Sequence, residues 1–138
     1  MSPDDCPLCT GAGGELLWHG ADHRVILADE PHHPGFCRVI WGAHVGEMSD
    51  LPAADAERLM RTVFTVERVL RRELAPAKVN LASLGNVVPH LHWHVIPRWS
   101  DDSHFPDPVW ASARRAAPVR TVDRVALVAA LREALAGG

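Results

Sequence analysis

The 138-residue chain has little cysteine, no excess of basic residues and no long apolar run. Its three cysteines, an odd number, argue against a disulfide scaffold. No apolar segment approaches the roughly 18 residues that a membrane span requires, and the acidic start MSPDDCPLC lacks a hydrophobic signal core. The net charge of −3 provides no basic field for non-specific nucleic-acid binding. We therefore expect a cytoplasmic protein with neither nucleic-acid nor membrane partners.

The composition that remains is that of one globular domain, with 47% apolar and 22% charged residues. Short apolar segments bounded by glycine, proline and aspartate predict strands. These strands are expected at residues 15–19, 24–28, 36–41, 78–84 and 90–96. The last two are joined by a short connector, which makes them antiparallel neighbours.

Two helices are also expected. The first extends from near Pro52 to near Leu74, with Ser49 or Asp50 available as its N-cap. Its apolar stripe at helical spacing consists of Leu59, Val63, Val66 and Leu70. The second helix is expected to begin at a cap formed by Thr121 or Asp123. Its apolar face is expected to consist of Val125, Val128, Leu131 and Leu135.

The remaining residues of interest lie mostly in loops. His32 and His33 belong to the proline- and glycine-containing loop 29–35 and are most simply solvent-exposed. Cys37 falls within a strand and is expected to be core packing rather than a nucleophile. The segment 99–110 has no periodicity, and we expect an ordered loop that packs over a site or against a second subunit.

The most unusual stretch is 90–96, which reads HLHWHVI. Its three histidines alternate with large apolar residues, and a period of two is typical of a β-strand. On a strand the imidazoles share one face, about 7 Å apart at about 3.3 Å rise per residue. Partly buried imidazoles cost free energy unless they are hydrogen-bonded or bound to something, so packing alone does not explain the row. The simpler alternatives are a solvated strand and an adventitious metal patch.

A row of imidazoles is suited to phosphorus chemistry. An imidazole can attack phosphorus and form a phosphoramidate that water later hydrolyses. This requires a neutral nucleophilic nitrogen whose ring partner donates a hydrogen bond that fixes the tautomer. His92 has an imidazole on each side and is the best-placed nucleophile. We expect His94 to hold a phosphate oxygen or protonate the leaving group, and His90 to brace the site or bind metal.

A second motif lies near the N-terminus, where Cys6 and Cys9 form a Cys-x-x-Cys pair. Such a pair can clamp zinc or form a redox couple. A redox pair would open a helix, but the glycine-rich segment 10–14 argues against a helix there. A zinc site needs two further ligands from elsewhere in the chain. The alternative is a pair of unligated cysteines.

The segment HLHWHVI resembles the motif His-φ-His-φ-His-φ-φ of the histidine triad (HIT) family, in which φ is apolar. The resemblance extends from about Cys6 to Trp110. It implies an α+β fold with an antiparallel sheet of about five strands, one long central helix and a C-terminal helix, assembled as a homodimer. We expect residues 1–110 to form the HIT domain, including the Cys-x-x-Cys pair. Residues 111–138 would then be a C-terminal extension with one helix packed on the same domain.

The resemblance also implies roles for single residues. In the family the middle histidine becomes nucleotidylated and the third contacts the α-phosphate, which maps onto His92 and His94. An asparagine on the preceding strand commonly lies near the phosphate and ribose, and Asn80 fits that position. Zinc-containing relatives use a Cys-x-x-Cys pair, a histidine after the third strand and the first triad histidine. The matching residues are Cys6, Cys9, His44 and His90, an S₂N₂ set for a structural zinc.

The sequence departs from the family pattern at three places. Gly85-Asn86-Val87 stands where many members have Gly-Gln followed by Ser or Thr, so Asn86 is our candidate for the glutamine. Ala28 occupies the usual position of the ribose-binding acid, and we take Asp29 as its substitute. The frequent Gly-His pair before the third strand reads Gly35-Phe36.

The row of histidines is suited to attack on phosphorus, and the resemblance implies a hydrolase or nucleotidyl transferase that acts on a purine nucleotide through a nucleotidyl-histidine intermediate. The bond cleaved would be a phosphoramidate or phosphoanhydride at the α-phosphate, as in nucleoside phosphoramidates or dinucleoside polyphosphates, and the chemistry would need no cofactor. One alternative is a nucleotide-binding module with little turnover. Another is a metallohydrolase held by the three histidines, but three side chains on one flat strand converge poorly on a metal.

Overall fold

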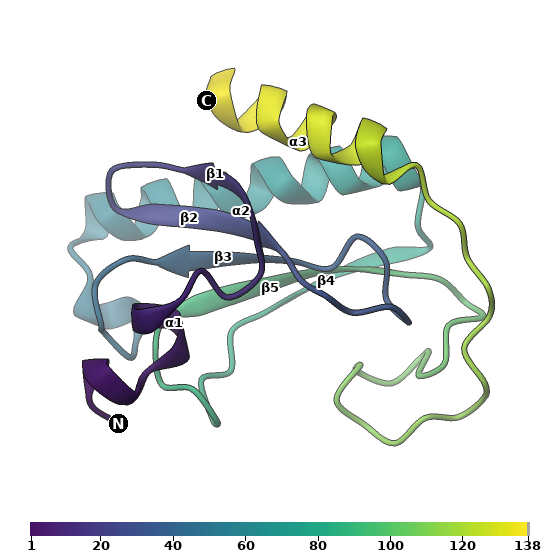
Figure 1. Cartoon of the computed structure of the whole chain (residues 1–138), viewed down its shortest axis with the longest axis horizontal. Helices are drawn as coiled ribbons and strands as arrows, with labels where there is room; N and C mark the ends of the chain where they lie inside the picture. The colour runs from purple at the N-terminus through teal and green to yellow at the C-terminus, as the bar shows by residue number, and fades with distance from the viewer. Residues whose placement is uncertain (138) are drawn as a thin grey trace.

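The computed structural model describes residues 1–137, which form a five-stranded antiparallel sheet with two long helices against one face (Figure 1). The strand order is β1-β2-β3-β5-β4. The strands are β1 Glu15–His19, β2 His23–Leu27, β3 Cys37–Trp41, β4 Lys78–Ala82 and β5 His92–Arg98. The predicted α+β fold with about five antiparallel strands and two long helices is therefore confirmed.

The histidine segment forms a strand inside the sheet. β5 lies between β3 and β4, and its residue His94 is paired with Arg38 on one side and Ala82 on the other. Alternation places Trp93 and Val95 toward the helices and the histidines on the opposite face. The strand begins at His92 rather than at residue 90, because the Leu91 amide donates to Val45 in a loop instead of to a neighbouring strand.

The long helix α2, Ala53–Leu74, covers the centre of the sheet. All four residues of the expected stripe are buried, together with Val69. The expected cap is wrong, because α2 begins directly after Pro52 without a side-chain cap. Asp50 instead closes the preceding 3-10 helix, Met48–Asp50, where it and Glu47 form a reciprocal capping box.

The C-terminal helix α3, Arg124–Gly137, packs against α2 and β1. The Asp123 carboxylate accepts a hydrogen bond from the Ala126 amide at its start. The expected apolar face is partly wrong, because Val125 is 78% exposed and Leu127 is buried in its place. None of the helices within residues 1–137 combines the length and apolar character that crossing a bilayer requires.

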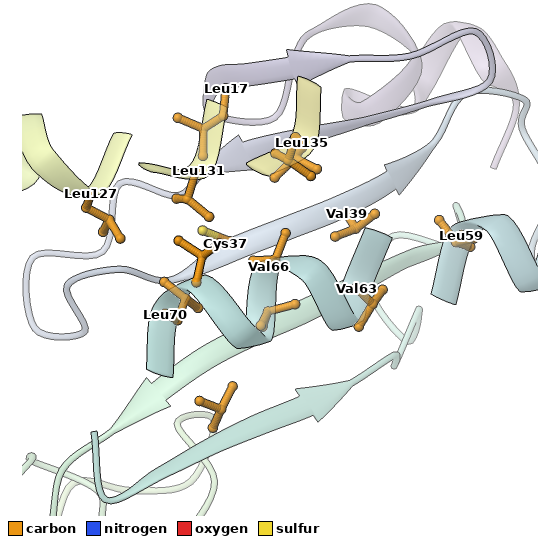
Figure 2. Close-up of a cluster of buried hydrophobic side chains, with 14 of the residues drawn as sticks. Leu17, Cys37, Val39, Leu59, Val63, Val66, Leu70, Leu127, Leu131 and Leu135 are labelled. Carbon is orange, nitrogen blue, oxygen red and sulfur yellow. The ribbon is translucent and has the colours of Figure 1, made fainter. Parts of the chain in front are cut away.

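Two apolar clusters occupy the two faces of the sheet. The larger one fills the space between the sheet and the helices, where Cys37 packs among valines and leucines (Figure 2). Burial raises the pKa of the Cys37 thiol to about 12, so it is inert packing. The smaller cluster lies under the N-terminal segment on the opposite face and consists of Cys6, Leu8, Ile26 and Ile40. This segment includes a one-turn helix, α1 Pro7–Thr10, where the sequence argued against a helix.

Candidate active site and metal cluster

The hydrogen bonds of His92 determine which of its nitrogens is free. Nδ1 donates to the backbone carbonyl of His90, which places the lone pair of the neutral ring on Nε2. Nε2 has no protein partner within residues 1–137. Among these residues, the one fully buried side-chain nitrogen or oxygen that lacks a partner is Nδ1 of His33. Nε2 of His92 is therefore not fully buried. Burial lowers the pKa of His92 and so favours this neutral form.

His94 has the opposite arrangement. Its ring lies 4.8 Å from the His92 ring, centroid to centroid. Its Nδ1 accepts a hydrogen bond of 3.4 Å from Nε of Arg38, so the hydrogen of the neutral ring is on Nε2. Burial, with smaller contributions from His92 and Arg38, lowers the pKa of His94 to about 3. The site therefore holds an acceptor, Nε2 of His92, beside a donor, Nε2–H of His94.

Arg38 is a site residue that the sequence reading missed. It lies on β3 directly opposite His94, with its guanidinium 5.0 Å from the Phe36 ring centre and 4.0 Å from a Glu30 carboxylate oxygen. Glu30 is half-exposed and the separation is long, so much of the positive charge beside the triad remains available. The signal was present in the sequence as one arginine within the apolar strand CRVIW.

The three expected nucleotide-binding residues have different environments. The Asn80 side-chain oxygen accepts a hydrogen bond of 2.8 Å from the buried Arg98, which leaves its amide hydrogens available. Asn86 and Asp29 are exposed, and within residues 1–137 neither side chain makes a hydrogen bond or ion pair. The structure thus brings Asn80 to the sheet near the triad strand and does not connect Asn86 or Asp29 to the histidines.

The segment after β5 packs over the site. This is one of the two arrangements expected for residues 99–110, the other being packing against a second subunit. Trp110 contacts His94, with ring centroids 4.9 Å apart. His104 contacts His33, with Nδ1 of the first 3.2 Å from Nε2 of the second. His33 is therefore only 5% exposed, and the expectation that it is a solvent-exposed loop residue is wrong.

A second cluster lies at the start of the triad. Its four residues, with ligand atoms within 4.8 Å of one another, are Cys6, Cys9, His44 and His90. Three sulfur–nitrogen distances are 3.3–3.5 Å, and the two Nδ1 atoms of His44 and His90 are 3.4 Å apart. Zinc bonds of about 2.3 Å to sulfur and about 2.0–2.1 Å to nitrogen in a tetrahedron require separations of about 3.5 Å and about 3.4 Å. The four residues fit a zinc ion.

The outer nitrogens of the two histidines support the same interpretation. Nε2 of His90 donates to the Trp41 carbonyl and Nε2 of His44 lies 3.1 Å from the Met1 carbonyl. Both hydrogen bonds direct the Nδ1 lone pairs toward the cysteines, as metal-binding histidines require. His90 thus belongs to this cluster through its side chain and to the triad through its carbonyl.

The sequence is similar to a known family and to known proteins. Residues 15–101 match the HIT domain family model. An AP-4-A phosphorylase from Mycobacterium tuberculosis is 31% identical over an alignment of 107 residues, and the match covers 73% of this chain and 55% of that protein. The chain therefore spans about half the length of the curated relatives it matches.

Solved structures share the fold. A histidine triad protein from Marinobacter aquaeolei has 26% identity and a TM-score of 0.73, with 91% of each chain covered. One from Bradyrhizobium japonicum has 25% identity and a TM-score of 0.70, with 86% of this chain and 90% of that chain covered. A zinc-bound histidine triad family protein from Mycobacterium smegmatis has 23% identity and a TM-score of 0.66, with 99% of this chain and 96% of that chain covered.

Proposed function

The chain belongs to the histidine triad (HIT) family, and we propose that it is a nucleotide hydrolase or nucleotidyl transferase that works through a nucleotidyl intermediate on His92. One observation carries this proposal: Nδ1 of His92 donates to a backbone carbonyl, while Nε2 has no partner among residues 1–137 and is not fully buried. A neutral imidazole in this tautomer is a nucleophile that needs no prior loss of a proton.

In the first step the Nε2 lone pair of His92 forms a bond to the α-phosphorus. The bond from phosphorus to the leaving nitrogen or oxygen breaks, and the leaving atom takes its electron pair and a proton from water. In the second step the hydroxide that remains from this water attacks phosphorus, and the electron pair of the P–Nε2 bond returns to the ring. One water is consumed for each bond cleaved. An acceptor other than water in the second step gives a transferase.

The surrounding residues supply stabilisation. The His90 carbonyl accepts from Nδ1–H throughout and stabilises the positive charge of the nucleotidylated ring. Nε2–H of His94 donates to a phosphate oxygen or to the leaving atom, and Arg38 places a guanidinium beside both histidines. This cation would supply a contact to phosphate in a sequence that has Val87 where the family pattern has a hydroxyl. The amide hydrogens of Asn80 remain available for the ribose or phosphate.

The substrate class that we propose is a purine nucleotide carrying a phosphoramidate or phosphoanhydride at its α-phosphate. The name of the AP-4-A phosphorylase relative supports a nucleotide substrate. The chemistry is proposed to need no cofactor. A homodimer and a cytoplasmic location are likewise proposals, the first of which light scattering of the purified chain at several concentrations can test.

A structural zinc ion is part of the proposal. Cys6, Cys9, His44 and His90 would hold it with no open ligand position, so it would supply no step of the reaction. Its effect would be to fix His90, whose carbonyl orients the His92 ring.

Intact-mass spectrometry after mixing with adenosine 5′-phosphoramidate or diadenosine tetraphosphate tests the proposal. We expect one added adenylyl group, absent in His92→Asn and retained in His32→Ala, a matched loss of an exposed histidine. Activity that disappears with a chelator while the fold persists would favour the metallohydrolase. Tight binding without adduct or turnover would favour the binding module.

A further inference from the structure

A hollow of about 490 Å³ lies on the helix-covered side of the sheet, away from the triad. It is bordered by the turn between β1 and β2, by the middle of α2 and by the end of α3 (Figure 1). Its volume is within the range of about 300–1,000 Å³ that small-molecule sites occupy. The proposed reaction uses none of the residues that line it, so the hollow is available to a different ligand.

Three residues that line the hollow form a chain of short hydrogen bonds. Nδ1 of His23 is 2.6 Å from Oδ1 of Asp22, and Nε2 of His23 is 2.7 Å from Oγ1 of Thr62. Although burial opposes ionisation, hydrogen bonds from His23 and Arg58 hold the pKa of Asp22 below its usual value. The single hydroxyl hydrogen of Thr62 goes to Nε2 or to the Arg58 carbonyl, 3.3 Å away. Toward a ligand, Thr62 therefore presents only an acceptor.

The histidine in this chain is held in place by aromatic rings. His23 is only 6% exposed, and its ring stacks on Trp41 with centroids 5.8 Å and planes 10° apart. Trp18, which lines the hollow, contacts the same imidazole with centroids 5.2 Å apart. The acceptor of Thr62 is thus positioned before any ligand arrives, which reduces the entropic cost of binding.

The charges around the hollow favour an anion. Arg58 is already paired with the carboxylates of Asp22 and Asp55. Arg68 also lines the hollow, and within residues 1–137 its guanidinium donates only to the Thr65 hydroxyl, at 3.4 Å. The charge of Arg68 is therefore available to a carboxylate, which a guanidinium binds through charge-assisted hydrogen bonds.

Aromatic surface lies between these two polar groups. Phe64 is between Thr62 and Arg68 in α2, lines the hollow and is 44% exposed. Trp18 from β1 and Leu135 from α3 add further apolar lining. Thr62 and Arg68 are six residues apart, which is about 9 Å along a helix axis. A flat ring with an N–H at one end and a carboxylate at the other matches this spacing.

We propose that this hollow is a second ligand site, which binds a small aromatic carboxylate that carries a ring N–H, such as an indole carboxylate. Arg68 binds the carboxylate, Thr62 accepts from the ring N–H, and Trp18 and Phe64 cover the ring. The site is separate from the triad, and the inference does not depend on the proposed function.

Isothermal titration calorimetry with indole-3-acetate tests this site. For a ligand of this size we expect a dissociation constant of about 0.1–1 mM. The acetate of 1-benzofuran, in which oxygen replaces the ring N–H, should bind about three- to tenfold more weakly, because the Thr62 oxygen then faces a second acceptor. Indole-3-acetamide, which has no charge, should also bind more weakly than the acid.

Two variants assign the contacts to single residues. Thr62→Val removes the acceptor at nearly constant shape, and should weaken the indole acid about three- to tenfold but the benzofuran acid less than about twofold. Arg68→Ala should weaken the indole acid about three- to tenfold and leave the acetamide nearly unchanged. Arg71→Ala, which removes an exposed arginine of α2 that does not line the hollow, is the matched control and should bind like the wild type.

The proposal would be overturned if the wild type bound no indole-3-acetate below about 10 mM. Equal weakening of both acids by Thr62→Val would also overturn it, because collapse of the hollow does not depend on the ring N–H. The same holds for equal losses of acid and acetamide in Arg68→Ala. Amide chemical shifts recorded during the titration should change at Ala21 and Thr62, and changes confined to His92 would contradict a separate site.

Discussion

Arg98 and Asp102 form a bidentate ion pair in which both residues are only 2% exposed. The pair joins the end of the triad strand to the segment that carries Trp110. Because each charge is buried, removing one partner leaves the other uncompensated in a low-dielectric environment. This relationship makes the stability of the chain and the shape of the site depend on the same two side chains.

Asp102→Ala should therefore lower the free energy of unfolding by about 3–5 kcal/mol. Urea denaturation followed by circular dichroism measures this change. The matched control is Asp101→Ala, which removes an exposed carboxylate paired with Arg120 and should cost no more than about 1 kcal/mol. Equal effects of the two substitutions would show that burial of the Arg98–Asp102 pair contributes little.

The same carboxylate should make stability depend on acid pH. Although burial opposes ionisation, hydrogen bonds from Arg98 and from the His104 and Phe105 amides hold the pKa of Asp102 well below its usual range. The unfolded chain then binds more protons than the folded chain below about pH 4. The contribution of Asp102 is complete above that pH and is lost as the pH falls toward its folded pKa. Urea midpoints measured from pH 6 to pH 2.5 should fall more steeply for the wild type than for Asp102→Asn.

Removal of Arg38 should impair the reaction more than it impairs the fold. Arg38→Leu is expected to lower kcat/KM for an adenosine phosphoramidate about ten- to hundredfold, because it removes a cation aimed at developing negative charge. Arg38→Lys should recover part of the rate. Arg61→Leu, an exposed arginine of α2, is the control and should be close to wild type. A wild-type rate for Arg38→Leu would exclude its role at the phosphate.

The cysteine and histidine cluster should hold one zinc ion per chain. We expect Cys9→Ser to lose the metal and lower the midpoint of thermal unfolding, because the ion ties the N-terminal segment to His44 and His90. Elemental analysis together with differential scanning calorimetry measures both changes. Cys37→Ala, which alters a cysteine in the core outside the cluster, should retain the metal. Full metal content in Cys9→Ser would contradict this assignment.

Local pattern determined the elements of the site. The alternation of HLHWHVI is a property of seven neighbouring residues, so it specified which side chains share a face before any partner was known. The stripe of α2 likewise fixed its buried side. Local pattern did not predict which apolar residue of α3 is buried, Val125 or Leu127. The rotation of α3 about its axis is set by the surface against which it packs.

The contacts between distant segments were decided by the tertiary structure. Arg38 lies beside His94 because β3 and β5 pair in one particular register, and Trp110 reaches the same ring because buried bonds from Arg98 direct its segment back over the sheet. His33 is buried for the same reason, and Asn86 and Asp29 stay exposed. The sequence by itself determined the strand, the face that carries its histidines and the family. The orientation of the imidazoles and the side chains that surround them depend on long-range hydrogen bonds and packing, which the periodicity of the sequence does not encode.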